Sequence, residues 1–552
     1  MSTPTASVGL SHRQILVVFS GLMLGMLLAA LDQTIVATAL PTIVGDLGGL
    51  DQLSWVVTAY LLTTTATTPL YGKISDLYGR KLVFQAAIVI FLAGSVLSGV
   101  AQSMGQLIAF RAVQGAGAGG LMVLAMAIIG DILSPRERGR YQGYLGAVFA
   151  LASIGGPLLG GLFTDHLSWR WVFYINLPIG IVALVVTSAV LDLPFERTPH
   201  RVDYRGAALL IGSVTSLLLV TVWGGTEYAW GSPVIVGLAV AGIVLGVAFA
   251  FQEHRAVEPI LPLRLFGNGV FNVTGAAGFL LGVAMFGTIV FLPLFLQVVT
   301  GVSATNSGLL LVPLMFGVIT SSILSGRLIT RTGRYKRFPI AGTILITVGL
   351  WLFSTMDATT SRPTVFAYMV VVGLGFGLIM QVLVLAVQNA VEQRDLGTAT
   401  SAANFFRQLG GSFGVAIFGA IFNNALGERL IALAPVTGGI DASVVQNSPE
   451  QIRALPSSTQ AALVDAFSGA LHTVFLWAVP IGVVAFLAVL LLQELPLREH
   501  AYVGGSLEGA GEELAVTFEP VSDPEHPIVL SDGHEAGGLL SDDHPDVDTP
   551  SG

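Results

Sequence analysis

A short charged stretch, Gly72–Lys81 (GKISDLYGRK), separates two long apolar runs. Its outline returns 254 positions later in Gly326–Arg334 (GRLITRTGR), with both glycines and the arginine at the same spacing. Glycine allows the sharp bend of a tight turn, and basic residues favour the cytoplasmic face of a membrane. Two copies in the same context predict an internal duplication, and therefore a fold built from two related halves.

The composition is that of a membrane protein. Only 11% of the 552 residues are charged and 53% are hydrophobic, with a mean hydropathy of +0.78. Soluble globular proteins carry roughly 25% charged residues, so we expect most of this chain to contact lipid. The absence of cysteine excludes disulfides, thiolate metal sites and cysteine nucleophiles. Nothing in the composition indicates a nucleic-acid surface.

The net charge of −9 comes from the end of the chain. Residues 499–552 contain thirteen Asp and Glu and no Lys or Arg, which leaves residues 1–498 with a net charge of +4. The low apolar content of this tail predicts a disordered, acidic cytoplasmic segment. Residues 1–14 are expected to form a short cytoplasmic N-terminus, and residues 427–466 a mixed polar loop on the outer side.

Fourteen segments of about 20 apolar residues are long enough to cross a bilayer. The expected spans are 15–40, 53–71, 82–101, 106–129, 142–164, 169–191, 205–223, 233–252, 269–298, 305–326, 338–356, 363–389, 403–424 and 468–492. The first is too long for a signal-peptide core and is predicted to be retained. The sequence therefore predicts an all-α polytopic membrane protein. Its two six-helix halves would be 15–191 and 269–492, with an inserted helix pair at 205–252.

Lys and Arg in the loops set the expected orientation, because cytoplasmic loops carry an excess of basic residues. With the N-terminus inside, nineteen Lys and Arg fall on the cytoplasmic side and four on the outer side. An even number of spans then places both ends of the chain in the cytoplasm. We therefore predict a multi-pass protein of the plasma (inner) membrane, in contact with membrane lipid.

The first span contains a carboxylate, Asp32, and the fourth contains a guanidinium, Arg111. A charged side chain at the centre of a membrane helix costs about 2.5–3.5 kcal/mol, so it normally faces a cavity or a partner. At 1.5 Å per residue, Asp32 lies about 12 Å and Arg111 about 8 Å from the outer ends of their antiparallel spans. The similar depth predicts that the two side chains pair.

Two roles for this pair follow from the residues. It either fixes the register of two helices, or it lies on the path of an ion or substrate, as ionisable groups within spans commonly do. We favour the second role, in which Asp32 takes up and releases a proton. Burial favours the neutral carboxyl and Arg111 favours the carboxylate. A change in the distance between Asp32 and Arg111 would therefore cause Asp32 to bind or release a proton.

Two glycine-rich runs imitate motifs of soluble enzymes. Gly115–Gly120 fits the G-x-G-x-x-G pattern of dinucleotide-binding proteins, and Gly410–Gly414 fits the G-x-S-x-G pattern of hydrolases. Both patterns depend on a preceding β-strand, whereas both runs lie in predicted membrane helices. We interpret them as sites of close helix packing, and we expect no cofactor, no metal and no enzyme activity.

The fifth span carries a further glycine cluster around a proline. Proline removes a backbone donor and glycine allows close approach, so a hinge or seal near the outer end and static packing are both open. The cluster consists of Gly155, Gly156, Pro157, Gly160 and Gly161.

Four residues are candidates for lining a cavity. Arg407 belongs to a polar cluster in the thirteenth span that either lines the cavity or binds lipid phosphate. The other candidates are Gln33, which follows the carboxylate of the first span, and the aromatic residues Tyr60 and Phe110.

These segments resemble the motifs of one family. Gly72–Lys81 resembles the signature between helices 2 and 3 of the major facilitator superfamily, Arg111–Gly115 its helix 4 motif, and Gly155–Gly161 its antiporter motif in helix 5. Leu31–Pro41 is similar to the helix 1 motif of the fourteen-helix drug:proton antiporters of the EmrB/QacA type. The resemblance covers about residues 15–495.

The resemblance implies a major facilitator fold and a transporter that works by alternating access. Such a protein exports hydrophobic or cationic small molecules in exchange for protons. The resemblance further implies that Asp32 carries the proton, with Arg111 as its partner and Gln114 and Gly115 in support. It also implies a cytoplasmic gating clamp formed by Gly72, Asp76, Gly79, Arg80 and Lys81. The second copy departs from the pattern, because Thr330 stands where the first copy has its aspartate.

Other functions remain open at this point. One is a dedicated exporter of a single endogenous metabolite, lipid or antibiotic. Another is a membrane receptor or scaffold without transport, which would tolerate the loss of Asp32. An uptake symporter is less favoured because the helix 5 motif resembles that of exporters.

Overall fold

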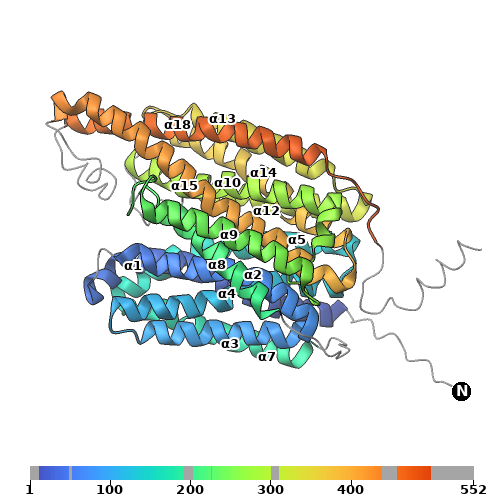
Figure 1. The fold of residues 1–552 in the computed structure, drawn as a ribbon. Coiled ribbons are helices and arrows are strands. Elements are labelled where there is room, and N and C mark those ends of the chain that lie inside the picture. The colour runs from blue at the N-terminus through green and yellow to red at the C-terminus, as the bar shows by residue number, and fades with distance from the viewer. Residues whose placement is uncertain are drawn as a thin grey trace, which may run out of the picture. The chain divides into compact units, whose positions relative to one another are not determined.

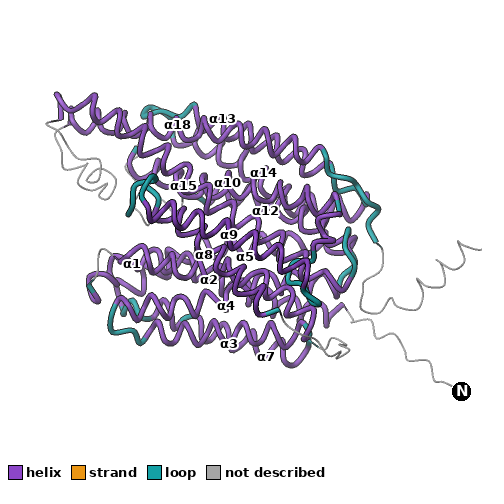
Figure 2. Tube along the Cα trace, viewed as in Figure 1, coloured by secondary structure: helices purple, strands orange, loops and turns teal. Residues whose placement is uncertain are grey.

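The computed structural model describes residues 12–48, 52–191, 203–225, 227–299, 310–437 and 457–498, and these residues are almost entirely helical (Figures 1 and 2). In the first part of the chain the helices are α1 (His12–Leu47), α2 (Leu53–Tyr78), α3 (Arg80–Gly99), α4 (Met104–Ile132), α5 (Pro135–His166), α6 (Trp171–Tyr174), α7 (Asn176–Val190), α8 (Tyr204–Trp223) and α9 (Pro233–Arg255). In the second part they are η2 (Leu263–Gly267), α10 (Gly269–Val298), α12 (Val312–Thr332), α13 (Arg337–Ser354), α14 (Arg362–Asn389), η3 (Gln393–Asp395), α15 (Leu396–Thr437) and α18 (Ser457–Leu490). The expectations for residues 1–11 and for the acidic tail 499–552 lie outside the described residues. The same holds for Arg197 and Arg201, two of the nineteen basic residues expected on the cytoplasmic side.

Thirteen helices in the described part are long and apolar enough to cross a membrane. The helix α2 is not among them although it has 26 residues, because its middle is rich in threonine. These hydroxyl groups bond to backbone carbonyls: Thr64 Oγ1 donates to Gly115 O of α4 at 3.1 Å, and Thr68 Oγ1 to Thr64 O at 2.7 Å. The prediction of an all-helical, multi-pass membrane fold is therefore confirmed, although α2 lacks an apolar stretch as long as those of the thirteen helices.

Several boundaries differ from the expected ones. The charged stretch is not a loop, because α2 continues to Tyr78 and α3 begins at Arg80, which leaves Gly79 as the only connecting residue. Gly79 has φ +93°, a conformation that residues with a Cβ rarely adopt, so one glycine makes the whole turn. Both ends of the expected loop 427–466 are helical, because α15 extends to Thr437 and α18 begins at Ser457; residues 438–456 lie outside the described residues.

Helix packing repeats between the two parts of the chain. In the first half (α1 to α7), α1 packs on α5, α4 on α2 and α3, and α7 on α1 and α3. In the second half (α10 to α18), α10 packs on α15, α14 on α12 and α13, and α18 on α10 and α13. The same order of partners appears twice, as expected of a duplicated unit. Figure 1 shows the first half mainly in blue and the second from yellow-green to red.

The halves meet through two equivalent pairs, α2 with α15 and α12 with α5. The inserted helices α8 and α9 pack on each other, and α8 also contacts α2 and α15. The extra pair therefore lies beside the line where the halves meet.

The two glycine-rich runs that resemble enzyme motifs are sites of close helix packing. A Cβ on Gly115 would overlap the backbone O of Tyr60 in α2, and a Cβ on Gly117 would overlap the backbone of Phe91 in α3. A Cβ on Gly410 would likewise overlap the backbone of α10. Since each glycine faces the backbone of a neighbouring helix, the interpretation as close packing is confirmed.

The glycine cluster of α5 divides into two kinds of position. A Cβ on Gly156 would overlap Thr34 Oγ1, and one on Gly160 would overlap Thr38 Oγ1, so these two glycines bring α5 against α1. A Cβ on Gly161 would meet nothing within 4 Å. Glycine is required only on the face of α5 that touches α1.

The remaining members of this cluster make no such contact. A Cβ on Gly155 would also meet nothing within 4 Å, and α5 is one continuous helix through Pro157. Static packing of α5 on α1 therefore accounts for Gly156 and Gly160, and a hinge at Pro157 stays a prediction.

We expect Gly160→Ala to lower the free energy of unfolding by about 1–3 kcal/mol, as overpacking does in a close-packed interior. The new Cβ would lie 2.9 Å from the backbone O of Ile35, which cannot move aside without shifting α1. Denaturant unfolding of the purified protein in detergent measures the effect.

The matched control is Gly161→Ala on the same helix. It is expected to equal the wild type or to exceed it slightly, because alanine is favoured over glycine in a helix by roughly 0.5–1 kcal/mol. Equal destabilisation by both substitutions would contradict the close contact between α1 and α5.

Candidate transport site and coupling residues

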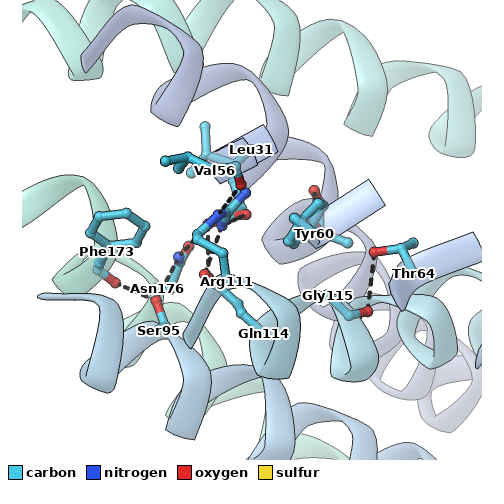
Figure 3. Close-up of polar contacts among 12 residues, drawn as sticks. Leu31, Val56, Tyr60, Thr64, Ser95, Arg111, Gln114, Gly115, Phe173 and Asn176 are labelled. Atoms are coloured by element: carbon cyan, nitrogen blue, oxygen red, sulfur yellow. Dashed lines mark hydrogen bonds and ion pairs between the residues drawn. The ribbon is translucent and has the colours of Figure 1, made fainter. Parts of the chain in front are cut away.

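The predicted pair of charges is present. Asp32 Oδ2 of α1 lies 2.6 Å from Arg111 Nη1 of α4, and the two residues are 0% and 1% exposed. Figure 3 shows Arg111 together with its neighbours Tyr60, Gln114 and Asn176. An unpaired charge in such surroundings would cost several kcal/mol, whereas a hydrogen-bonded ion pair offsets that cost. The two helices thus bring the two groups together, as the sequence predicts.

The remaining oxygen of the carboxylate is bound by amide donors. Gln114 Nε2 donates to Asp32 Oδ1 at 2.8 Å, and Asn176 Nδ2 donates to the same oxygen at 3.3 Å. Arg111 Nη1 also donates to Gln114 Oε1 at 2.7 Å, and Arg111 Nε to Val56 O at 3.4 Å. Two helices besides α1, namely α4 and α7, therefore bind the carboxylate directly, and α2 binds its partner Arg111. The expected supporting contact of Gln114 is confirmed.

Asn176 was not identified from the sequence. It is the first residue of α7 and lies near the start of the span Trp171–Val190. Its Nδ2 also donates to Ser95 Oγ at 3.0 Å, and its Oδ1 has no partner among the described atoms. The only signal in the sequence was a single amide inside an otherwise apolar span.

The two aromatic candidates do not line the cavity described below. Tyr60 is 1% exposed and lies under Arg111, with the guanidinium carbon 4.1 Å from the ring centroid. Such a cation–π contact stabilises the buried guanidinium. Phe110 packs instead against a hydrophobic cluster that includes Trp169 and Phe173. Both predictions were wrong because each side chain faces the interior of the first half.

The clamp joins the two halves at one end of the bundle, which we call the clamp end. Asp76 Oδ2 of α2 accepts hydrogen bonds from Thr398 N and Thr398 Oγ1, both at 2.8 Å, and Asp76 Oδ1 accepts one from Gly397 N at 3.2 Å. Arg80 Nη1 lies 2.5 Å from Asp76 Oδ1, and Arg80 Nε lies 2.8 Å from Asp131 Oδ2. A carboxylate at the N-terminus of α15 also interacts favourably with the helix dipole.

Two other members of the predicted clamp have different roles. Gly72 lets α2 approach α15, because a Cβ there would overlap Ser401 Oγ. Lys81 does not take part, since its Nζ donates to Ser188 O of α7 at 2.9 Å. It follows Arg80 by one position, and successive helical residues point about 100° apart. The clamp is therefore made by Asp76 and Arg80.

A second contact between the halves lies at the same end. Arg138 Nη1 of α5 donates to Gln388 Oε1 of α14 at 2.8 Å, and Arg136 Nε donates to Thr330 O of α12 at 3.1 Å. The hydroxyl of Thr330 donates to Gly326 O at 2.9 Å. The second copy of the repeat thus contributes a backbone carbonyl at the position where the first contributes a carboxylate.

A cavity of about 520 Å³ lies away from the clamp end. Its walls come from α1, α2, α4, α5, α8, α10, α14 and α15, together with the turn between α8 and α9. The contribution of α2 runs from Thr58 to Thr65, more than ten residues before Asp76. Of the four candidates, Gln33 and Arg407 line the cavity, as predicted. Among the described residues, no cluster of side chains could hold a metal ion.

These features define a multi-pass membrane transporter: two similarly packed halves, joined at one end, with a cavity toward the other. The chain belongs to the Major Facilitator Superfamily, whose family model matches residues 22–415. This is a family of transporters rather than enzymes.

The relatives include bacterial drug transporters. The chain is 46% identical over 483 residues to an uncharacterized MFS-type transporter of Mycobacterium tuberculosis, covering 88% of this chain and 70% of that protein. It is 39% identical over 490 residues to the multidrug transporter protein MdtP of Bacillus subtilis (84% and 90% covered). It is 37% identical over 490 residues to multidrug resistance protein 3 of the same organism (87% and 96%).

Solved structures share the fold. The chain matches the human organic anion transporter MFSD10 with a TM-score of 0.59 at 16% identity, covering 86% of this chain and 99% of that one. It matches the proton:xylose symporter XylE with a TM-score of 0.57 at 15% identity (86% and 95%). At such low identity, these likenesses show the fold alone.

We expect Asp76→Asn to open the clamp end. The substitution keeps the size of the side chain but removes charge-assisted hydrogen bonds, each worth about 1.5–3 kcal/mol. The chain has no cysteine, so a single Val384→Cys reports on this end. Val384 is 8% exposed and packs with residues of the first half. Its alkylation in detergent should become about tenfold faster, since 1.4 kcal/mol is a factor of ten.

Asp395→Asn is the matched control for this measurement. Asp395 is also buried and precedes the same helix, but it pairs with Arg264 of the second half at 2.8 Å. Alkylation should stay at the rate of the parent variant. An unchanged rate in Asp76→Asn would contradict the role of the clamp.

Proposed function

We propose that this protein is a secondary active efflux transporter that exports hydrophobic small molecules in exchange for protons, with Asp32 as the proton carrier. The observation that supports this most is the burial of one carboxylate, paired with Arg111, on the helix whose next residue, Gln33, lines the cavity. The names of the relatives MdtP and multidrug resistance protein 3 support drugs as substrates.

The proton and the exported compound would occupy different places on α1. Asp32 is 0% exposed and does not line the cavity, whereas Gln33 does. Because successive helical residues point about 100° apart, one helix can face Arg111 on one side and the cavity on another. A movement of α1 would therefore change the surroundings of both Asp32 and the cavity, which would couple proton binding to substrate binding.

Protonation of Asp32 would weaken the hold of α4 on α1. The neutral carboxyl loses its charge-assisted bond to Arg111 and becomes a donor that needs an acceptor. Asn176 can supply this acceptor, because its Oδ1 is unpaired and rotation of the amide would turn it toward the carboxyl. The carboxyl group of Asp32 would thus have a hydrogen-bond partner before and after proton uptake, while its charge-assisted bond to α4 is lost and α1 can move.

The contacts at the clamp end support one of the two states of alternating access. If both ends of the chain are cytoplasmic, as the distribution of Lys and Arg predicts, the clamp closes the cytoplasmic side and the cavity lies toward the outside. A proton that moves through about 150 mV releases roughly 3.5 kcal/mol. That is enough to concentrate a neutral compound roughly 300-fold.

Purified protein in liposomes with an enclosed pH-sensitive dye tests the proposal. Hydrophobic compounds added one at a time should start proton movement in the wild type, and this movement should vanish in Asp32→Asn. Thermal unfolding shows whether the variant is folded. Compound-driven proton movement at the wild-type rate in Asp32→Asn would remove Asp32 from the mechanism.

Asp46→Asn is the control on the same helix. Asp46 is exposed, and hydrogen bonds from Trp169 and Arg170 hold its pKa below the ordinary value. Its carboxylate therefore stays ionised near neutral pH and cannot carry a proton there. Proton movement in this variant should match the wild type.

A further inference from the structure

We infer that the cavity binds amphipathic organic anions, with an apolar body and a carboxylate or sulfonate group, and that Arg407 is their counter-charge. The inference rests on the proposed function in that it takes this cavity as the place where exported compounds bind. It replaces the broader expectation of hydrophobic or cationic compounds with a specific chemical class.

The charge of the cavity wall has one source. Among the described residues that line the cavity, Arg407 is the only charged one, and none is an aspartate or glutamate. The walls are otherwise made of apolar side chains, amides and hydroxyls, so the dielectric constant is low and the field of the guanidinium is weakly screened. Such a cavity attracts anions and repels cations.

The guanidinium of Arg407 is not neutralised by the protein. In the described part of the chain, the buried Arg80 and Arg111 each pair with a carboxylate, whereas no ion pair involves Arg407. Its hydrogen bond runs from Nη2 to Asn404 Oδ1 at 2.7 Å. A guanidinium has five N–H donors, so most of them have no partner among the described residues. Arginine is also the side chain best shaped to bind a carboxylate through two parallel hydrogen bonds.

The proton-carrying carboxylate does not cancel this charge. Asp32 lies next to Gln33 in the sequence, but its oxygens are bound to Arg111, Gln114 and Asn176. A cation in the cavity would therefore meet a guanidinium and find no free carboxylate on the wall.

The rest of the wall fits the body of an amphipathic molecule. Phe286, Phe291 and Trp230 supply aromatic surface, and Gln33 and Asn423 supply amide groups. A volume of about 520 Å³ falls within the usual range of drug-sized sites, roughly 300–1,000 Å³. An apolar body with one anionic group would thus satisfy both parts of the wall.

Three ligands that share one fluorophore test the inference: dansyl glycine is an anion, dansyl amide is neutral and dansyl cadaverine is a cation. Equilibrium dialysis against the purified full-length protein measures their binding. Dansyl glycine should bind at least tenfold more tightly than dansyl cadaverine. Equal binding of the anion and the cation, or tighter binding of the cation, would overturn the inference.

Variants of Arg407 separate charge from structure. Arg407→Gln should lose at least tenfold in affinity for dansyl glycine and keep its affinity for dansyl amide within twofold, which also shows that the cavity is intact. Arg407→Lys should retain most of the preference for the anion. Arg429→Gln, an exposed position on the same helix that does not line the cavity, should bind all three ligands as the wild type does. An equal loss for the neutral ligand in Arg407→Gln would assign Arg407 a structural role and overturn the inference.

Binding at equilibrium does not depend on proton coupling. A preference for dansyl glycine without any proton exchange in liposomes would therefore contradict the proposed function and leave the anion site in place. Proton exchange driven by dansyl cadaverine but not by dansyl glycine would support a proton antiporter and contradict the anion site.

Discussion

A carboxylate and a guanidinium without access to water, Asp32 and Arg111, form the interaction on which the rest of the structure depends. Neither charge could stay in a membrane interior alone. Neighbouring side chains stabilise both charges. Two amides donate to Asp32 Oδ1, the oxygen that Arg111 does not bind, and an aromatic ring packs against the guanidinium. The glycines of α4 permit this arrangement, because they let α2 and α3 approach closely from two sides.

The two ends of the bundle are held by different chemistry. At the clamp end, charged side chains of the first half bind backbone donors and amides of the second half, and α15 receives a carboxylate at its positive end. Toward the other end, the halves diverge around a wall of apolar side chains and amides. Charge-assisted bonds between the halves are therefore concentrated at the clamp end, whereas a neutral hydrogen bond from Thr65 to Gln408 joins the halves on the cavity wall. This asymmetry fits the alternating access proposed above.

Much of this could be predicted from the sequence. Apolar length placed the spans to within a few residues for most helices, and counting along them placed Asp32 and Arg111 at the same depth. What the sequence lacks is the direction in which each side chain points around its helix. Tyr60 and Phe110 were assigned to the cavity and Lys81 to the clamp, although each faces a neighbouring helix instead.

The role of Asn176 was also beyond the sequence, because it depends on how α7 packs against α1 and α3. Before the helices are assembled, Asn176 is an ordinary polar residue in an apolar span. The charge of the cavity wall could not be foreseen for a related reason. It depends on which charged side chains face the cavity, and this is known only once the helices are packed together.

The turn between α8 and α9 contributes Gly224, Gly225 and Trp230 to the wall of the cavity, although it belongs to neither half. This part of the wall is separated in the chain from Asp32 and Arg111. If the proposed function holds, substitutions or insertions in this turn would alter the spectrum of exported compounds and leave the proposed coupling residues intact. Under selection by a new toxin, the inserted hairpin would be the element free to diversify first.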